Sequence, residues 1–297
     1  MRIAYLGTPG VAVAPLVALH DAGHDIVAVV TGPDRRRGRG TATSPSPVKA
    51  AAVERGLSVT HDLGELSGSD AELGVVVAYG RIIPSPLLDE IPMVNLHFSL
   101  LPRWRGAAPV ERAILAGDTM TGVCVMDVAA QLDEGDVHDR AEVPISDDVT
   151  ADELRAELAA VGTDLLVRRL DVGLGAASPQ VGELIYAHKL TSDDRRIDWS
   201  GSATQAHRVV RVGDAHTTFR GERFKIHRTT ATTIADDDDR GPHPPGELVD
   251  DVIACGVGAL APLEVQAAGA ARMTWGSWRH GAQPRPGERF GETGAAP

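Results

Sequence analysis

The amino-acid sequence predicts an α/β protein with a doubly wound parallel sheet, followed by a smaller β-barrel domain. Residues 1–31 alternate strand, helix and strand within the length of one βαβ unit. Later runs such as 74–78 are apolar throughout, as is typical of strands that are covered on both faces. The pattern changes near residue 185, where short β-like segments begin to recur at the spacing of a small barrel.

Each element of the N-terminal part follows from its local pattern. Residues 1–6 predict a strand that ends in the turn 7–10, and helical spacing then runs from 11 to 22 before Gly23. The other strands are expected over continuous apolar or β-branched runs, and the other helices where apolar residues recur every three or four positions. The strands are 25–31, 57–60, 74–78, 93–97, 121–128 and 142–145, and the helices are 46–55, 107–116 and 150–173.

The C-terminal part has shorter elements. A polar stretch over 186–199 without clean periodicity predicts a linker, and 203–212 predicts a short helix. Short strands are expected over 217–220, 224–229, 246–252, 254–257 and 263–267. The charged, proline-rich stretch 235–245, with its run Asp236 to Asp239, predicts a disordered hairpin tip, and 281–297 a loose tail. We therefore expect a first domain over 1–184, a linker over 185–202 and a second domain over 203–297.

Charge and cysteine content exclude several classes of protein. The 29 Lys and Arg against 41 Asp and Glu give a net charge of −12, which argues against broad nonspecific binding of nucleic acid but allows a local basic patch. Cys124 and Cys255 are too few for a disulfide framework or a zinc site. No apolar run approaches the ~18–20 residues of a membrane helix, and no secretory signal pattern is present. We expect a cytoplasmic protein with no membrane contact and no metal.

The strand 93–97 ends in two polar side chains. Asn95 and His97 are spaced i, i+2, so both point to the same side of the sheet. An amide donor and an imidazole aimed at one point can stabilise a developing oxyanion, and an imidazole can also move protons near neutral pH. A satisfied hydrogen-bond network is the structural alternative.

Two aspartates follow the strand that ends near residue 128. Asp133 and Asp136 lie in a glycine-containing turn, where an aspartate usually caps the backbone. A carboxylate is also what an Asn/His site requires to orient and charge its imidazole. Both interpretations remain open at this stage.

Arginines gather in two segments. Residues 33–40 hold four Arg, one Asp and two Gly, and Arg103 and Arg105 flank Trp104. A charge run is often a solvated face, but a flexible Arg/Gly loop also suits a polyanion. The Trp104 ring is equally suited to packing and to stacking on a base.

Six ordered motifs resemble the methionyl-tRNA formyltransferase family and span nearly the whole chain. The longest is the 15-residue segment 95–109, NLHFSLLPRWRGAAP. The others are LGTP at 6–9, PDR, GRG and SPSPVK within 33–49, VAYG at 77–80, LDEGD at 132–136, and YAHKL with RIDW within 186–199.

The resemblance implies a Rossmann-like formyltransferase domain, a C-terminal OB-like barrel, and 10-formyltetrahydrofolate as donor of a formyl group to initiator methionyl-tRNA. It assigns catalysis to Asn95, His97 and Asp133. It assigns folate binding, largely through main-chain groups near 81–83 and 128–132, to Tyr79, Gly80, Arg81, Ile82, Ser99, Leu100, Leu101, Pro102, Val128 and Leu132. It assigns tRNA binding to Arg35, Arg36, Arg37, Arg39, Arg103 and Arg105.

Two other functions are compatible with the sequence. A folate-dependent N-formyltransferase acting on an amino-sugar nucleotide or a glycinamide ribotide would use the same three catalytic residues. A non-catalytic tRNA-binding or folate-sensing protein would not need them. The arginine loop, the Trp104 segment and the barrel-like second domain favour the tRNA substrate.

Overall fold

The computed structural model describes residues 1–36, 43–234, 243–285 and 287–292, so the Asp236 to Asp239 run lies outside the described residues. The chain divides into two compact units. The first comprises Met1–Arg112, Thr119–Ile145 and Glu153–Lys189, and the second comprises Ala113–Asp118, Ser146–Asp152 and Leu190–Pro297.

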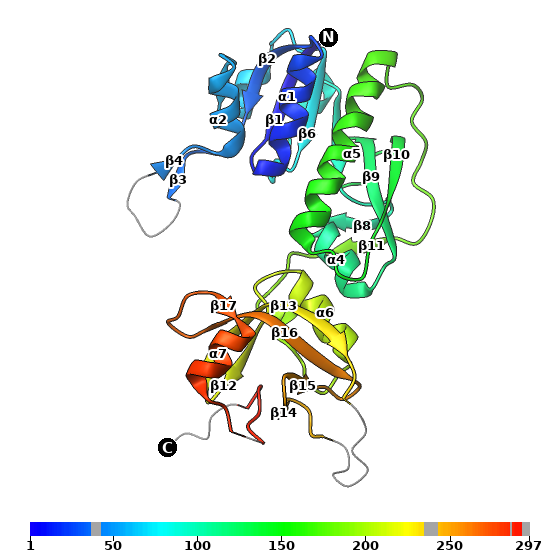
Figure 1. Cartoon of the computed structure of the whole chain (residues 1–297). Coiled ribbons are helices and arrows are strands. Elements are labelled where there is room, and N and C mark those ends of the chain that lie inside the picture. Colours follow the sequence, from blue (N-terminus) through cyan, green and yellow to red (C-terminus); the bar gives the residue numbers. More distant parts are fainter. Residues whose placement is uncertain (37–42, 235–242, 286, 293–297) are drawn as a thin grey trace. The chain divides into compact units, whose positions relative to one another are not determined.

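The first unit is built on a seven-stranded sheet of order β10-β9-β7-β6-β1-β2-β5 (Figure 1). Its strands are β1 (Arg2–Gly7), β2 (Asp25–Val30), β5 (Val59–Thr60), β6 (Leu73–Val77), β7 (Met93–His97), β9 (Met120–Asp127) and β10 (Val137–Pro144). Neighbouring strands in the series β7-β6-β1-β2-β5 are parallel. β9 pairs antiparallel with β7, and β10 pairs antiparallel with β9. The predicted parallel sheet is thus confirmed, and every residue of β6 is buried. The edge strand β10 begins five residues earlier than 142. Its polar residues escaped the apolar pattern because they lie at the edge of the sheet, where β10 pairs with β9 and, through Val137 alone among the described residues, with Ser178.

The first unit contains helices α1 (Val13–Asp21), α2 (Pro47–Glu54) and α3 (Ser85–Glu90), with 3₁₀ turns η1 (Gly10–Ala12) and η2 (Leu63–Leu66). It also contains the first half of α4 (Pro109–Ala116) and most of α5 (Ala151–Val172), whose residues 113–116 and 151–152 belong to the second unit. Ser46 caps α2, since its side chain accepts a hydrogen bond from the Lys49 N–H, and Pro47 follows in the first turn. The Tyr5 hydroxyl donates to the Ala12 carbonyl at 2.6 Å and so ties β1 to η1.

Two short sheets complete the first unit. β8 (Arg103–Gly106) pairs in parallel with β11 (Ile185–Ala187), and β3 (Arg35–Arg36) pairs with β4 (Thr43–Ser44). The residues expected as a linker therefore begin with a strand. They also contribute two side chains to the core of the second unit, Ile197 and Trp199.

The second unit has a curled antiparallel sheet of order β12-β13-β16-β15-β14, with β17 paired to β16 (Figure 1). Its elements are η3 (Asp193–Arg195), α6 (Ala203–Arg211), β12 (His216–Phe219), β13 (Glu222–Thr232), β14 (Leu248–Val249), β15 (Val252–Ala254), β16 (Ala259–Ala267), β17 (Met273–Thr274) and α7 (Trp275–Ala282). This sheet is the barrel-like second domain that the sequence predicts, although β15 ends where a strand over 254–257 was expected to begin.

The expectation of a loose tail over 281–297 was wrong for part of that segment. Phe290 is 2% exposed and packs in the aromatic core, where its ring lies 4.7 Å from that of Phe219. Helix α7 was also missed, and it buries Trp275 and Trp278 in the same core. Its sequence contains two glycines and several polar residues, so packing of these tryptophans stabilises a helix that local propensity does not favour.

Both cysteines are buried free thiols. Burial raises the pKa of the Cys255 thiol to about 11. Among the residues that the structure describes, no helix is long and apolar enough to cross a membrane.

Candidate active site

The alternation of side chains along β7 presents two polar residues on one face. Leu96 points toward α5, where a Cβ on Gly162 would lie only 3.0 Å from its methyl groups. Since successive residues of a strand face opposite ways, Asn95 and His97 lie on the other face of the sheet. His97 is the last residue of the strand, so the pair stands at its carboxyl end.

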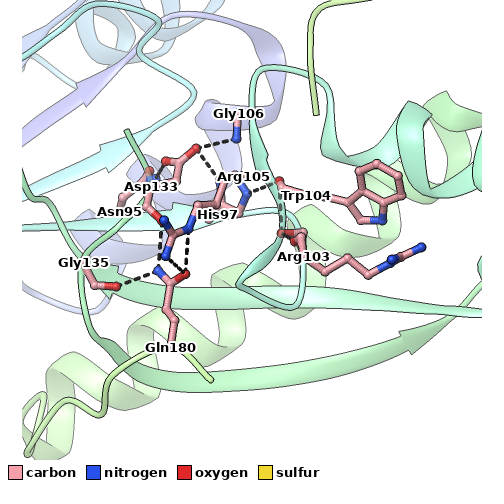
Figure 2. Close-up of polar contacts among 10 residues, drawn as sticks. Asn95, His97, Arg103, Trp104, Arg105, Gly106, Asp133, Gly135 and Gln180 are labelled. Carbon is pink, nitrogen blue, oxygen red and sulfur yellow. Dashed lines mark hydrogen bonds and ion pairs between the residues drawn. The ribbon is translucent and has the colours of Figure 1, made fainter. Parts of the chain in front are cut away.

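Asp133 meets both of these side chains (Figure 2). Asn95 Nδ2 donates to Asp133 Oδ1 at 3.5 Å, and His97 Nδ1 lies 3.7 Å from Asp133 Oδ2. The shortest of these contacts to the carboxylate is a 2.8 Å hydrogen bond from the Gly106 N–H to Oδ2. The structure therefore brings together the three residues that the sequence assigns to catalysis, while the Asp136 side chain is exposed and makes no such contact among the described residues.

The second nitrogen of His97 fixes its tautomer. Nε2 lies 3.0 Å from the carbonyl oxygen of Trp104, and a carbonyl can only accept, so Nε2 carries a hydrogen. The nitrogen that faces Asp133 is Nδ1. The side chains of His97 and Asp133 are only 6% and 10% exposed, and an ion pair between them is therefore weakly screened.

Three residues of this site have a positive φ, a backbone conformation that residues with a side chain rarely adopt. Asp133 and Trp104 have φ values of 54° and 65°, and Gly106 has a φ of 118°. Such strain in non-glycine residues clusters at functional sites. Gly135 lies so close to the Asp127 carbonyl that a Cβ could not be accommodated.

A side chain that the sequence analysis missed supports the loop of Asp133. Gln180 donates to the carbonyls of Asp133 and Gly135 at 2.9 and 2.8 Å. Its own oxygen accepts two hydrogen bonds from Arg105, whose third contact is Glu134 at 2.9 Å. Gln180 lies in an irregular segment between α5 and β11, and no local motif identifies it.

The arginines assigned to tRNA occupy different environments. Arg35 and Arg36 are exposed on β3, and Arg37 and Arg39 lie outside the described residues. Arg105 is instead 7% exposed and bonded to protein partners. The Arg103 guanidinium lies 4.6 Å from the centre of the Trp104 ring, which is itself 9% exposed and therefore packs in the protein.

The residues assigned to folate binding divide into an exposed and a buried group. Gly80, Arg81 and Ile82 are exposed after β6, with Ile82 at 88%, and Leu132 is 64% exposed beyond β9. Arg81 donates from Nη1 to the His61 carbonyl and to the Tyr79 hydroxyl, which places its guanidinium beside a buried tyrosine. The buried or half-buried members are Tyr79, Ser99, Leu100, Leu101, Pro102 and Val128.

The buried members shape the turn after β7. The Ser99 hydroxyl donates to the Arg103 carbonyl at 2.7 Å, and the Leu101–Pro102 peptide bond is cis. Leu101 is 1% exposed within a small core cluster. Ser99 and Leu101 therefore have no exposed side chain to offer a ligand.

The described side chains do not form a metal centre. Within 1–36, 43–234, 243–285 and 287–292, no group of three or more His, Cys, Asp or Glu is arranged to hold a metal ion.

Comparisons with known proteins agree with this architecture. Residues 1–170 match the Formyl transferase family, and residues 189–283 match the Formyl transferase, C-terminal domain family. The methionyl-tRNA formyltransferase of Stutzerimonas stutzeri is 40% identical over 93% of both chains, and that of Rhizorhabdus wittichii is 43% identical over 95% of both. An N-formyltransferase from Helicobacter canadensis, solved with folinic acid and dTDP-3-aminofucose, shares the fold with a TM-score of 0.66 at 16% identity, over 92% of this chain and 100% of that one.

The two domain matches and the near-complete coverage of relatives at about 40% identity agree with the motifs of the sequence. The chain belongs to the methionyl-tRNA formyltransferase family.

Proposed function

We propose that this protein transfers the formyl group of 10-formyltetrahydrofolate to the α-amine of methionyl initiator tRNA. The convergence of Asn95, His97 and Asp133 at the end of β7 carries the chemical part of the proposal. Full-length identity to methionyl-tRNA formyltransferases supports the choice of acceptor. A role in translation initiation would place the protein in the cytoplasm.

The exposed groups near the site fit a folate. A pterin has flat aromatic faces and an edge of amide-like donors and acceptors, so it needs apolar surface beside accessible main-chain groups. Ile82 and Leu132 supply exposed apolar surface, and Gly80 and Arg81 expose main chain next to them. These residues lie in the segments that follow β6 and β9, and they would hold the pterin between them. When bound, the folate supplies an activated formyl group.

Asn95 and His97 would stabilise the negative charge that develops on the formyl oxygen when the amine attacks the formyl carbon. Asn95 Nδ2 is a neutral donor, and protonated His97 is a charged donor through Nδ1. Because Nε2 is bound to the Trp104 carbonyl, the imidazole cannot rotate without breaking that bond. Preorganised donors of this kind typically contribute ~10²–10³ each in rate.

Asp133 would hold His97 in its charged form and take the proton that the attacking amine loses, directly or through a water. The leaving nitrogen of the folate then departs with a proton, so protons balance over the cycle. The distances of 3.5 and 3.7 Å from Asp133 to Asn95 and His97 are long for hydrogen bonds. Such contacts commonly tighten only when substrate is bound.

The acceptor can be tested directly. The purified protein is incubated with 10-formyltetrahydrofolate and either methionyl initiator tRNA or a dTDP-linked 3-amino sugar, and formylated product is measured for each. We expect formylmethionyl-tRNA and no formylated sugar. Formylation of the sugar nucleotide alone would establish the alternative enzyme, and formylation of neither would exclude both.

A further inference from the structure

We infer that Gln180 is a positioning residue for formyl transfer, acting through the backbone of Asp133. The inference rests on the proposed function, because it takes Asp133 to be the group that receives the proton. Gln180 is 47 positions from Asp133 in the sequence and reaches the Asp133 carbonyl at 2.9 Å. Gln180 therefore lies outside the 132–136 loop in the sequence, and its side chain hydrogen-bonds to the main chain of Asp133.

All hydrogen-bonding groups of the Gln180 amide are occupied. Its nitrogen donates to the carbonyls of Asp133 and Gly135, and its oxygen accepts from Nε and Nη2 of Arg105 at 2.9 and 2.7 Å. An amide has two donor hydrogens and two acceptor lone pairs, and all four are used here. A flipped amide would face two carbonyls with its oxygen and a guanidinium with its nitrogen, so only one orientation is possible.

Arg105 connects this amide to the loop a second time. Its Nη1 donates to Glu134 Oε1 at 2.9 Å. Together with the bonds from Gln180 to the Asp133 and Gly135 carbonyls, the Gln180–Arg105 pair, which Figure 2 shows, thus holds residues 133, 134 and 135. The Arg105 side chain is 9% exposed and that of Glu134 is 32% exposed. Buried charge is stable only when paired. The neutral Gln180 amide and the Glu134 carboxylate together bind the guanidinium, and the charges of Arg105 and Glu134 cancel each other.

The loop needs this support because its conformation is unfavourable. Asp133 has a φ of 54°, in the left-handed region that residues with a side chain rarely adopt. Without Gln180, the carbonyls of Asp133 and Gly135 would lose these hydrogen bonds, and the loop would shift toward a less strained backbone conformation. A displacement of about 1 Å at a reacting group can cost on the order of 10²-fold in rate.

The first test replaces Gln180 in the full-length protein. We expect Gln180→Leu to lower kcat by roughly 10- to 100-fold while KM for both substrates stays within about twofold, because no substrate contact is removed. Gln180→Glu keeps the bonds to Arg105 but places oxygen against both carbonyls, and it should be similarly impaired. Should Gln180→Leu fail to fold, Gln180→Glu gives the same test with nearly the same shape. Gln266→Leu is the matched control, since Gln266 is also half-buried and donates to a backbone carbonyl, that of Ala270, in the second unit.

A double-mutant cycle separates positioning from general structural support. If Gln180 acts through Asp133, Gln180→Leu should cause little additional loss of kcat in an Asp133→Asn background. Purely additive losses in the double variant would overturn the inference. Hydrogen exchange of the peptide over 128–136, measured without substrates, should be faster in Gln180→Leu than in Gln266→Leu.

Arg105 supplies an independent test. Arg105→Lys retains a charge for Glu134 but cannot donate to Gln180 with two nitrogens. The inference predicts reduced kcat with an unchanged KM for tRNA and an unchanged salt dependence. A raised KM for tRNA with a flatter salt dependence would mean that Arg105 contacts phosphate instead. Unchanged kcat in both Gln180 variants, with an active wild type, would refute the inference alone, whereas an inactive wild type would refute the proposed function.

Discussion

The Gly106 N–H donates a 2.8 Å hydrogen bond to the Asp133 carboxylate, across 27 positions of sequence. The bond requires glycine at position 106, because the backbone there has a φ of 118°. A Cβ would also lie 2.9 Å from the Ala187 carbonyl oxygen, where β8 pairs with β11. The position of the carboxylate is therefore linked to a pairing of two short strands far apart in the chain.

Gly106→Ala should reduce both activity and stability. The strained φ alone costs of order 1–3 kcal/mol, and the added methyl displaces the N–H that binds Asp133. We expect kcat to fall at least about tenfold and the thermal midpoint to decrease. Gly276→Ala is the control, since Gly276 lies in α7 with open space around it and alanine is favoured in a helix. Equal activity of Gly106→Ala and Gly276→Ala would contradict the role of this bond.

Asn95→Ala should lower kcat by at least about tenfold, because it removes one donor to the developing oxyanion. The fold should persist, since Asn95 is half-buried and, within the part of the chain that the structure describes, its side chain bonds only to Asp133, at 3.5 Å. Near-normal turnover in a folded variant would rule out this role.

The same residue offers a spectroscopic test. Asn95 is the only asparagine in the sequence, so side-chain ¹⁵N-labelled asparagine gives one amide signal. We expect that signal to shift on addition of a formyl-folate analogue and to be absent in Asn95→Ala. A signal that the analogue leaves unchanged would place Asn95 away from the bound formyl group.

The exposed arginines of β3 should contribute to tRNA affinity. Replacing both Arg35 and Arg36 by alanine should raise KM for tRNA and leave kcat and the KM for folate unchanged. The slope of log KM against log salt should fall by up to about 1.4–1.8, if each arginine neutralises one phosphate. Arg140→Ala, an exposed arginine of the edge strand β10, is the control. An unchanged slope in the double variant would exclude phosphate contacts by these arginines.

His207 should make stability fall at mildly acidic pH. Its side chain is buried between Thr229, at 2.9 Å from Nδ1, and Asp148, at 3.1 Å from Nε2. Burial, aided by the positive charge of Arg211, lowers the pKa of His207 below 6.5, although Asp148 opposes the shift. The unfolded chain therefore binds a proton near pH 6.5 that the folded chain does not yet bind.

This contribution is fully present above pH 6.5 and is lost as the pH falls toward the lowered pKa. His207→Gln should therefore show a smaller decrease in thermal midpoint between pH 7.5 and 5.5 than the wild type. His280→Gln, at an exposed position of α7, should retain the wild-type decrease. Identical pH profiles for all three proteins would contradict the assignment.

Much of the fold follows from local patterns. The apolar run of β6 and the capped start of α2 are visible in the sequence, because burial on both faces and a serine before proline each leave a local pattern. Helix α7 and the buried Phe290 were missed, since both depend on an aromatic core assembled from distant segments. Helix α7 and the position of Phe290 are stabilised by packing, which the local sequence propensities do not predict.

The sequence by itself identified the candidate catalytic groups. The spacing of Asn95 and His97 on one strand places both on one side of the sheet, and the carboxylate they need was found in the loop of Asp133. Only the tertiary structure decided which nitrogen of His97 faces that carboxylate, and that Arg105 is turned inward to Gln180 instead of outward to solvent. These outcomes depend on carbonyls and amides that meet only when β7, β8 and the segment before β11 fold together. Hydrogen bonds between groups so distant in sequence leave no periodic pattern along the chain.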